Sequence, residues 1–200
     1  MICHEIVNFL SNDELSYIEK NKYDSKKYKS SNNKTLTLYK ARLPNTLIKK
    51  IKPYGDIYIS QIYELEQPYR IHNDTRNEIQ TKFSCIISLD INPQGGLIIF
   101  DQSADKFSYS LDNYYGSNYN KHLSDINDRE KIIKNFDRDK KLPDIESLSH
   151  IKENDKIGFT IFKIIQYEFN KLIVFPSNYF HCSENIKNFT NKKSLLLITK

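Results

Sequence analysis

Residues 63–74 of the chain read Tyr63-Glu-Leu-Glu-Gln-Pro-Tyr-Arg-Ile-His72-Asn-Asp74, and the rest of the sequence can be interpreted from this segment. Residues 57–62 before it alternate between apolar and other side chains, which predicts a β-strand. Side chains two positions apart on a strand point to the same side, so we expect His72 and Asp74 to converge on one point. An imidazole and a carboxylate placed in this way can hold a metal ion, although most His-x-Asp triplets lie on protein surfaces and bind no metal.

A second histidine strengthens the case for a metal site. His181 closes the segment Lys171-Leu-Ile-Val-Phe-Pro-Ser-Asn-Tyr-Phe-His181, which predicts a buried strand that turns at Pro-Ser-Asn. Two imidazoles and one carboxylate on one face of an octahedron leave three positions open. Non-haem Fe(II) oxygenases use this arrangement to admit a co-substrate and O2. A charged anchor for a co-substrate is available near the C-terminus, where Lys192, Lys193 and Ser194 precede the apolar run 195–198.

The order of these motifs resembles the 2-oxoglutarate/Fe(II)-dependent dioxygenases. His-x-Asp is followed by Gly-Gly, then by Phe-Pro-Ser-x-x-x-His, and then by a basic residue with a Ser shortly after it. The segment from Tyr63 to Asp74 is most similar to the prolyl-4-hydroxylase-like branch, in which a tyrosine nine residues before the first ligand helps to hold 2-oxoglutarate. The region from Phe159 to His181 also resembles small bacterial and phage oxygenases. The resemblance covers roughly residues 55–200.

The resemblance implies a ligand set and a reaction. His72, Asp74 and His181 would bind Fe(II), with 2-oxoglutarate and O2 taking the open positions. Halogenases of this family replace the carboxylate ligand with a small residue, and Asp74 is retained here, so hydroxylation of an unactivated C–H bond is expected. Succinate and CO2 would be released. The substrate would be an amino acid, a peptidyl residue, a small metabolite or a nucleobase.

The resemblance also implies residues that hold 2-oxoglutarate. Its far carboxylate would contact a cationic side chain and a serine that lies two residues later on the same face of the last strand. Lys192 and Ser194 have this spacing. The spacing from the second histidine is one residue longer than usual, so Lys193 remains a competitor. Tyr63 is the expected hydroxyl partner.

Turn signals divide the second half of the chain into many short strands, and the helical patterns lie mostly in the first half. This predicts a mainly β fold with flanking helices, a double-stranded β-helix (jelly roll, cupin-like), as the resemblance also implies. We expect one oxygenase domain over residues 1–200, with an N-terminal support at 1–54, a jelly-roll core at 55–101 and 157–200, and an insert or lid at 102–156.

Local signals predict further elements. Ser11 and Glu14 form a capping box, from which a helix would point Leu15, Tyr17 and Ile18 inward. We also expect a polar loop at 21–34, a strand at 35–43 and a helix at 44–51. A second strand is expected at 81–91, with Phe83, Cys85, Ile87 and Leu89 on one face. Residues 158–167 and 171–175 are expected to form a hairpin around a left-handed Asn170.

The insert is the least regular part of the sequence. Residues 125–136 predict a helix. The aromatic side chains near its start are Phe107, Tyr109, Tyr114, Tyr115 and Tyr119. A long segment between core strands is either an active-site lid or a decorative surface subdomain, and both interpretations stay open.

Composition limits the remaining function classes. The net charge of +5 is mild and spread along the chain, so nucleic-acid binding is not expected. Three cysteines without metal-type spacing argue against a disulfide framework and for a reducing cytoplasm. No apolar stretch is long enough to span a bilayer, and the first ten residues lack the length and basic start of a signal peptide.

Several alternatives remain. A cupin-like metal protein could use the same triad without 2-oxoglutarate, and a jelly-roll binding module could have lost catalysis.

Cys182 is expected in the core, since neighbouring strand residues point to opposite faces. Arg70 and Arg76 flank the metal segment, where they would meet an acidic group of a substrate or form surface salt bridges.

Overall fold

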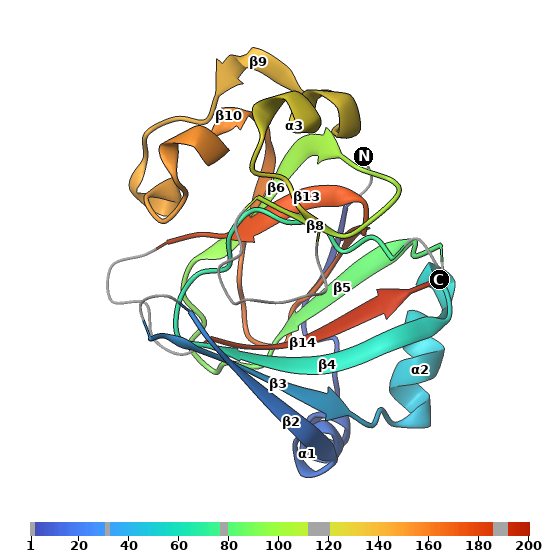
Figure 1. The fold of residues 1–200 in the computed structure, drawn as a ribbon. Coiled ribbons are helices and arrows are strands. Elements are labelled where there is room, and N and C mark those ends of the chain that lie inside the picture. The colour runs from blue at the N-terminus through green and yellow to red at the C-terminus, as the bar shows by residue number, and fades with distance from the viewer. Residues whose placement is uncertain (1–2, 31–32, 77–79, 112–120, 186–191) are drawn as a thin grey trace.

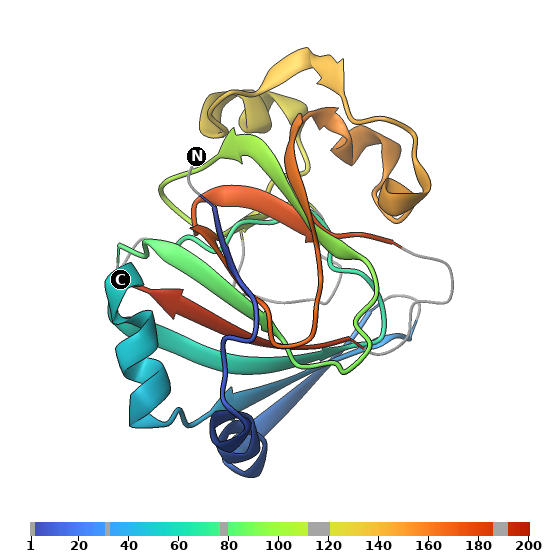
Figure 2. The same ribbon diagram turned by 180° about the vertical axis from the view of Figure 1, so that it is seen from behind.

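The computed structural model describes residues 3–30, 33–76, 80–111, 121–185 and 192–200, and its chain is arranged in layers (Figures 1 and 2). Two helices lie under a large sheet, a small sheet faces the other side of the large sheet, and the insert covers the small sheet. None of the described helices is long and apolar enough to cross a membrane.

The large sheet has seven strands, and every neighbouring pair is antiparallel. Their order is β1 (His4–Ile6), β12 (Leu172–Pro176), β5 (Phe83–Ser88), β14 (Lys192–Thr199), β4 (Ile57–Leu65), β3 (Thr35–Ala41) and β2 (Lys22–Lys29). The small sheet is also antiparallel, in the order β11 (Ile161–Gln166), β6 (Gly96–Ser103) and β13 (Tyr179–Ser183).

The two sheets bury apolar side chains against each other. Leu97 and Ile99 of the small sheet pack with Phe175, Leu196 and other residues of the large sheet. Within the large sheet, strands from distant parts of the chain, such as β5 and β14, are neighbours. This arrangement confirms the predicted double-stranded β-helix with flanking helices.

The N-terminal helices pack on the outer face of the large sheet. They are α1 (Asn12–Lys20), α2 (Asn45–Ile51) and the 3-10 helix η1 (Lys52–Tyr54). The predicted capping box is present, because Ser11 Oγ accepts from the Glu14 amide while Glu14 Oε2 accepts from the Ser11 amide. Ile18 is fully buried and Leu15 packs against the same core. Tyr17 is 40% exposed, so its predicted inward position is wrong.

The predicted polar loop at 21–34 is largely wrong, since residues 22–29 form the edge strand β2. This strand obtains its structure from backbone hydrogen bonds to β3, and most of its side chains are exposed. Apolar alternation is therefore absent from its sequence. Its lysines are typical of an edge strand that must not pair with another chain.

The predicted hairpin of 158–167 and 171–175 is also wrong. Strand β11 pairs with β6 in the small sheet, whereas β12 pairs with β1 and β5 in the large one. Asn170 has the expected left-handed conformation, with φ of 58°. Its side-chain amide accepts from the Leu10 amide and donates to the Leu10 carbonyl, both at 2.7 Å, which fixes the crossing between sheets. Periodicity identifies strands but not the sheet that each one joins.

The insert packs on the outer face of the small sheet, where its Phe136 meets Phe159, which in turn packs against Phe100 and Phe180. Its elements are β7 (Tyr109–Ser110), β8 (Lys121–His122), α3 (Ile126–Ile132), β9 (Asp137–Lys141), η3 (Glu146–Leu148), η4 (Glu153–Asp155) and β10 (Ile157–Gly158). The buried Arg129 ties the insert together by donating to the Leu123 carbonyl and to Asp155. Tyr114, Tyr115 and Tyr119 lie outside the described residues.

Candidate metal and co-substrate site

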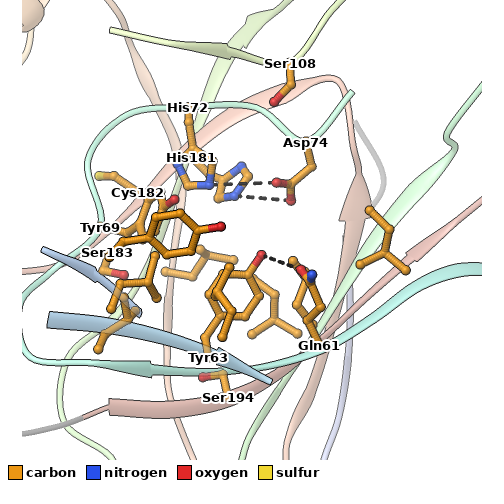
Figure 3. Close-up of a pocket in the computed structure, with 18 of the residues that line it drawn as sticks. Gln61, Tyr63, Tyr69, His72, Asp74, Ser108, His181, Cys182, Ser183 and Ser194 are labelled. Carbon is orange, nitrogen blue, oxygen red and sulfur yellow. Dashed lines mark hydrogen bonds and ion pairs between the residues drawn. The ribbon is translucent and has the colours of Figure 1, made fainter. Parts of the chain in front are cut away.

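A cavity of about 800 Å³ opens between the sheets. One wall is the concave face of the large sheet, and the other is formed by the segment 69–76, strand β13 and the start of the insert. All six residues that the sequence predicted for the site line this cavity: Tyr63, His72, Asp74, His181, Lys192 and Ser194. Figure 3 shows the triad on one side of the cavity, facing Tyr63 and Gln61 on the other.

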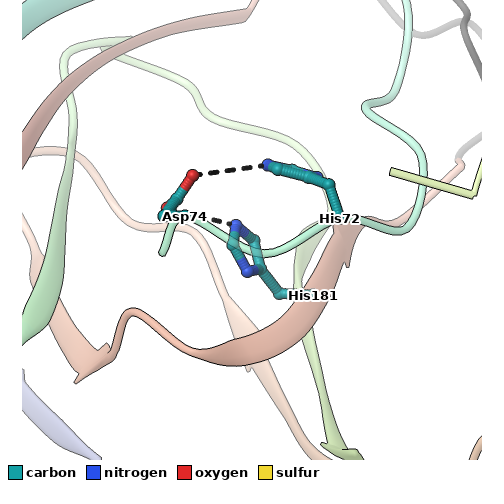
Figure 4. Close-up of side chains that lie close together, drawn as sticks. All are labelled: His72, Asp74 and His181. Atoms are coloured by element: carbon teal, nitrogen blue, oxygen red, sulfur yellow. Dashed lines mark ion pairs between the residues drawn. The ribbon is translucent and has the colours of Figure 1, made fainter. Parts of the chain in front are cut away.

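His72, Asp74 and His181 form a compact cluster (Figure 4). Their ligand atoms all lie within 4.8 Å of one another. Nε2 of His72 is 3.8 Å from Asp74 Oδ1, and Nε2 of His181 is 3.6 Å from Asp74 Oδ2. The three side chains therefore present two nitrogen atoms and one carboxylate toward a common centre, which is a donor set that suits Fe(II).

The convergence has a different origin from the one predicted. Strand β4 ends at Leu65, and His72 lies in an isolated bridge with His181. The two histidines exchange backbone hydrogen bonds of 3.0 and 2.8 Å, and the Asp74 amide donates to the Ser177 carbonyl. The segment that carries His72 and Asp74 therefore pairs with β13, which carries His181, and with the turn before it. This pairing positions His72 and Asp74.

Backbone carbonyls fix the orientation of both imidazole rings. Nδ1 of His72 is 2.8 Å from the Arg70 carbonyl, and Nδ1 of His181 is 3.2 Å from the Tyr179 carbonyl. A carbonyl only accepts, so each Nδ1 carries the proton and each Nε2 lone pair faces Asp74. Burial lowers the pKa of His72 to about 4, helped by the nearby His181, and burial also lowers the pKa of His181. Two Nε2 lone pairs that face one carboxylate group fit a bound cation.

Sequence reasoning missed the side chains that hold the triad. Ser84 Oγ donates to Asp74 Oδ2 at 2.7 Å. The Tyr69 ring lies against His72 with centroids 4.4 Å apart, and the edge of Phe175 meets His181 at 4.8 Å. The sequence could have predicted the position of Ser84. It alternates with Phe83 and Cys85 along the strand, so its side chain must face the interior of the barrel rather than the helices.

Asn73 was also missed, although it stands between the two ligands of the His-x-Asp motif. It is fully buried, and its side-chain amide donates to the Ala104 carbonyl at 2.9 Å while accepting from the Tyr109 amide at 2.6 Å. Asn73 thus fastens the metal segment to the start of the insert. A buried asparagine of this kind has no signature in a single sequence.

The second half of the site lies on β4 and β14. Ser194 is directly opposite Tyr63, and Lys192 is two residues earlier on the same face. The Lys192 ammonium lies 3.6 Å above the ring centre of Tyr167 and 3.4 Å from Ser183 Oγ. Ser194 Oγ is buried and has no hydrogen-bond partner among the described residues.

Burial changes the protonation of this end of the cavity. It lowers the pKa of Lys192 to about 7, against the opposing effect of the Asp90 carboxylate. Burial also raises the pKa of Tyr63, so its hydroxyl keeps its proton. A buried cation and protonated hydroxyl groups form a binding site for an anion.

Lys193, the competing anchor, points to the opposite face of β14. Its ammonium pairs with Glu19 at 2.5 Å and lies 3.9 Å from Glu64, away from the cavity. Of the two arginines that flank the triad, Arg76 lines the cavity and Arg70 does not. Cys182 is fully buried, as expected.

Comparisons with known proteins find similarity only at the level of structure. No protein-family model and no curated protein matches the chain. The non-haem alpha-ketoglutarate-dependent carbocyclase SnoK of nogalamycin biosynthesis gives a TM-score of 0.50 at 10% identity, over 98% of this chain and 79% of that chain.

Two further solved structures are similar. An oxidoreductase of the 2OG-Fe(II) oxygenase family from Burkholderia pseudomallei gives a TM-score of 0.48 at 10% identity, over 98% of this chain and 82% of that chain. A Pseudomonas putida prolyl-4-hydroxylase gives 0.46 at 11% identity, over 99% and 92%. The match to SnoK shows that this chain shares the fold of that non-haem alpha-ketoglutarate-dependent carbocyclase.

Proposed function

We propose that this protein is an Fe(II)- and 2-oxoglutarate-dependent oxygenase that hydroxylates an unactivated C–H bond of an amino acid, a peptidyl residue or a small metabolite. One observation carries the proposal: the His72–Asp74–His181 cluster, formed by β13 and the segment 69–76, and the Lys192–Ser194 pair on β14 open into the same cavity. A metal site and an anion site in one cavity are what a chelating keto acid requires.

The metal half of the proposal rests on the donor set. Neutral imidazoles and one carboxylate bind Fe(II) and leave sites for a co-substrate. When bound, Fe(II) with 2-oxoglutarate and O2 supplies the oxidising power and yields succinate and CO2. The carbonyls of Arg70 and Tyr179 keep the Nε2 atoms unprotonated, and Ser84 keeps the Asp74 carboxylate oriented.

The co-substrate half rests on β14. The Lys192 ammonium would pair with the far carboxylate of 2-oxoglutarate, and Ser194 Oγ would donate the hydrogen bond that it does not make elsewhere in the described structure. Tyr63 stands directly opposite Ser194 and would donate a second one. The ion pair of Lys193 with Glu19 on the outer face favours Lys192 as the anchor.

Anaerobic titration with Fe(II) and then 2-oxoglutarate tests the proposal. We expect a weak visible metal-to-ligand charge-transfer band, which His72→Ala abolishes. Lys192→Met should weaken 2-oxoglutarate binding severely, whereas the matched control Lys193→Met should not. Binding of iron without a band would instead support a cupin-like protein that does not use 2-oxoglutarate. Absence of iron binding would support a non-catalytic jelly-roll module.

A further inference from the structure

The concave face of the large sheet contains two rows of side chains that run across the strands into the cavity. The register places Lys26, Leu38, Tyr63 and Ser194 in one row on β2, β3, β4 and β14. In the next row Lys40 pairs with Gln61, which pairs with Leu196. One row therefore contains Lys26 on β2 and the other contains Lys40 on β3, and both rows end next to the proposed 2-oxoglutarate site.

The lysines at the start of the rows are too distant to serve the co-substrate. Adjacent strands lie about 4.8 Å apart, so the backbone of Lys26 is about 14 Å from that of Ser194. A five-carbon keto acid held by the metal and by β14 does not extend to β2. Lys26 and Lys40 consequently line the part of the cavity that remains for the substrate.

This part of the cavity is positively charged. Apart from the triad and Lys192, the charged residues that line the cavity are Lys26, Lys40, Arg76, Lys121 and Asp24. The single carboxylate among them, that of Asp24, forms a 2.5 Å ion pair with Lys40. Four cations against one carboxylate leave an excess of positive charge, which attracts anions into a cleft.

The same region also offers apolar contact surface. Tyr28 and Leu36 lie beside the lysine rows on β2 and β3, and Phe107 lies on the facing wall. The Lys121 ammonium is 3.2 Å above the centre of the Phe107 ring. A ligand that satisfies both kinds of surface has an apolar or aromatic body and an anionic end.

We propose that the substrate is an organic anion, whose carboxylate or phosphate group is held by Lys26 and Lys40 while its apolar body extends toward the metal triad. This inference rests on the proposed function. The class includes carboxylic acids and phosphate monoesters, which share the anionic oxygens that lysine binds.

The sheet provides a matched pair of variants. Lys26 faces the cavity, whereas Lys27 and Lys29 alternate with it on β2 and do not line the cavity. The double variants Lys26→Gln/Lys40→Gln and Lys27→Gln/Lys29→Gln remove the same total charge. The ion pair lost with Lys40 is exposed, so it contributes little to stability.

Calorimetric titration of the full chain should use three probes: 3-phenylpropionate, phenyl phosphate and the neutral 3-phenylpropanamide. It is carried out with the protein alone and with the protein loaded anaerobically with Fe(II) and 2-oxoglutarate. We expect at least one anion to bind about tenfold more tightly than the amide. Lys26→Gln/Lys40→Gln should remove this preference, and Lys27→Gln/Lys29→Gln should retain it. The tighter anion identifies the carboxylic acid or the phosphate monoester.

Three results would overturn the inference: no preference for either anion, equal loss in both double variants, or competition between the probe and 2-oxoglutarate. Failure of the proposed function has a different signature. The charge-transfer band would then be absent, while the anion preference of the protein alone and its loss in Lys26→Gln/Lys40→Gln would persist.

Discussion

Tyr63 on β4 and Ser194 on β14 are directly opposed, so their side chains share the cavity face of the large sheet. The Tyr63 hydroxyl lies 3.3 Å from Gln61 Oε1, at a distance and position that allow it to turn toward a ligand (Figure 3). The pair brings together two residues that are far apart in the sequence but serve one proposed carboxylate site.

Tyr63→Phe removes one proposed donor without changing the ring. A hydrogen bond to a charged group contributes about 1.5–3 kcal/mol, so the Kd for 2-oxoglutarate should rise by about tenfold or more. The affinity for Fe(II) alone should not change. Tyr39→Phe, on the other face of the neighbouring strand β3, is the control. Unchanged 2-oxoglutarate binding in Tyr63→Phe would exclude its role.

Lys192 predicts a pH dependence of 2-oxoglutarate binding. Its pKa is lowered to about 7 by burial, and a bound carboxylate would raise it again. Binding should therefore take up protons near and above pH 7, and affinity should fall as the pH rises through this range. Calorimetry in buffers of different ionisation enthalpy measures the uptake. Lys192→Arg, which stays charged, should bind without this dependence; an identical decline would point to another group.

Ser84→Ala tests the support of Asp74. Loss of the 2.7 Å hydrogen bond leaves the carboxylate free to rotate. Removal of such a partner typically reduces metal affinity by about 10–100-fold. Ser88→Ala is a matched control, because Ser88 is buried on the same face of β5 and its hydroxyl has no partner among the described residues. Equal metal affinities for the two variants would contradict the assignment.

Asn73→Ala should lower the free energy of unfolding by about 1–3 kcal/mol, since it leaves the buried Tyr109 amide without its acceptor and removes one of the donors to the Ala104 carbonyl, which keeps the Thr75 hydroxyl. Because Asn73 separates two ligands, Fe(II) affinity should fall as well. Denaturant unfolding of the metal-free protein measures the first effect, and metal titration the second. The half-buried Asn185→Ala, which loses one exposed hydrogen bond to Ser149, should change stability by no more than about 0.5 kcal/mol.

His150 predicts an acid-dependent loss of stability. Burial lowers its pKa to about 4, compared with about 6.5 in an unfolded chain. Between these values the unfolded state binds more protons, so stability is present above pH 6.5 and falls as the pH decreases toward 4. His150→Gln should reduce this decline by up to about 3 kcal/mol in the metal-free protein. The exposed His122→Gln should not, and an unchanged profile in His150→Gln would refute the prediction.

The sequence was informative where local chemistry fixes structure. The Ser11–Glu14 capping box, the left-handed Asn170 and the alternation of Cys85 and Ile87 are each decided by residues within a few positions, and each is present. It failed for β2 and for the partners of β11 and β12, because a strand's hydrogen bonds come from backbone that can lie anywhere in the chain. The role of each predicted site residue stays a prediction.

The amino-acid order already specifies the donor types and their spacing: two imidazoles, one carboxylate, and a lysine and a serine two residues apart on a strand. The tertiary structure decided which of them meet. Backbone pairing of His72 with His181 creates the triad, the pleat of β14 separates Lys192 from Lys193, and β2 adds Lys26 to a cavity whose other wall is formed by residues from Tyr69 onward in the chain. Side-chain chemistry is local, whereas strand pairing joins distant backbone segments and is not encoded in any single window of sequence.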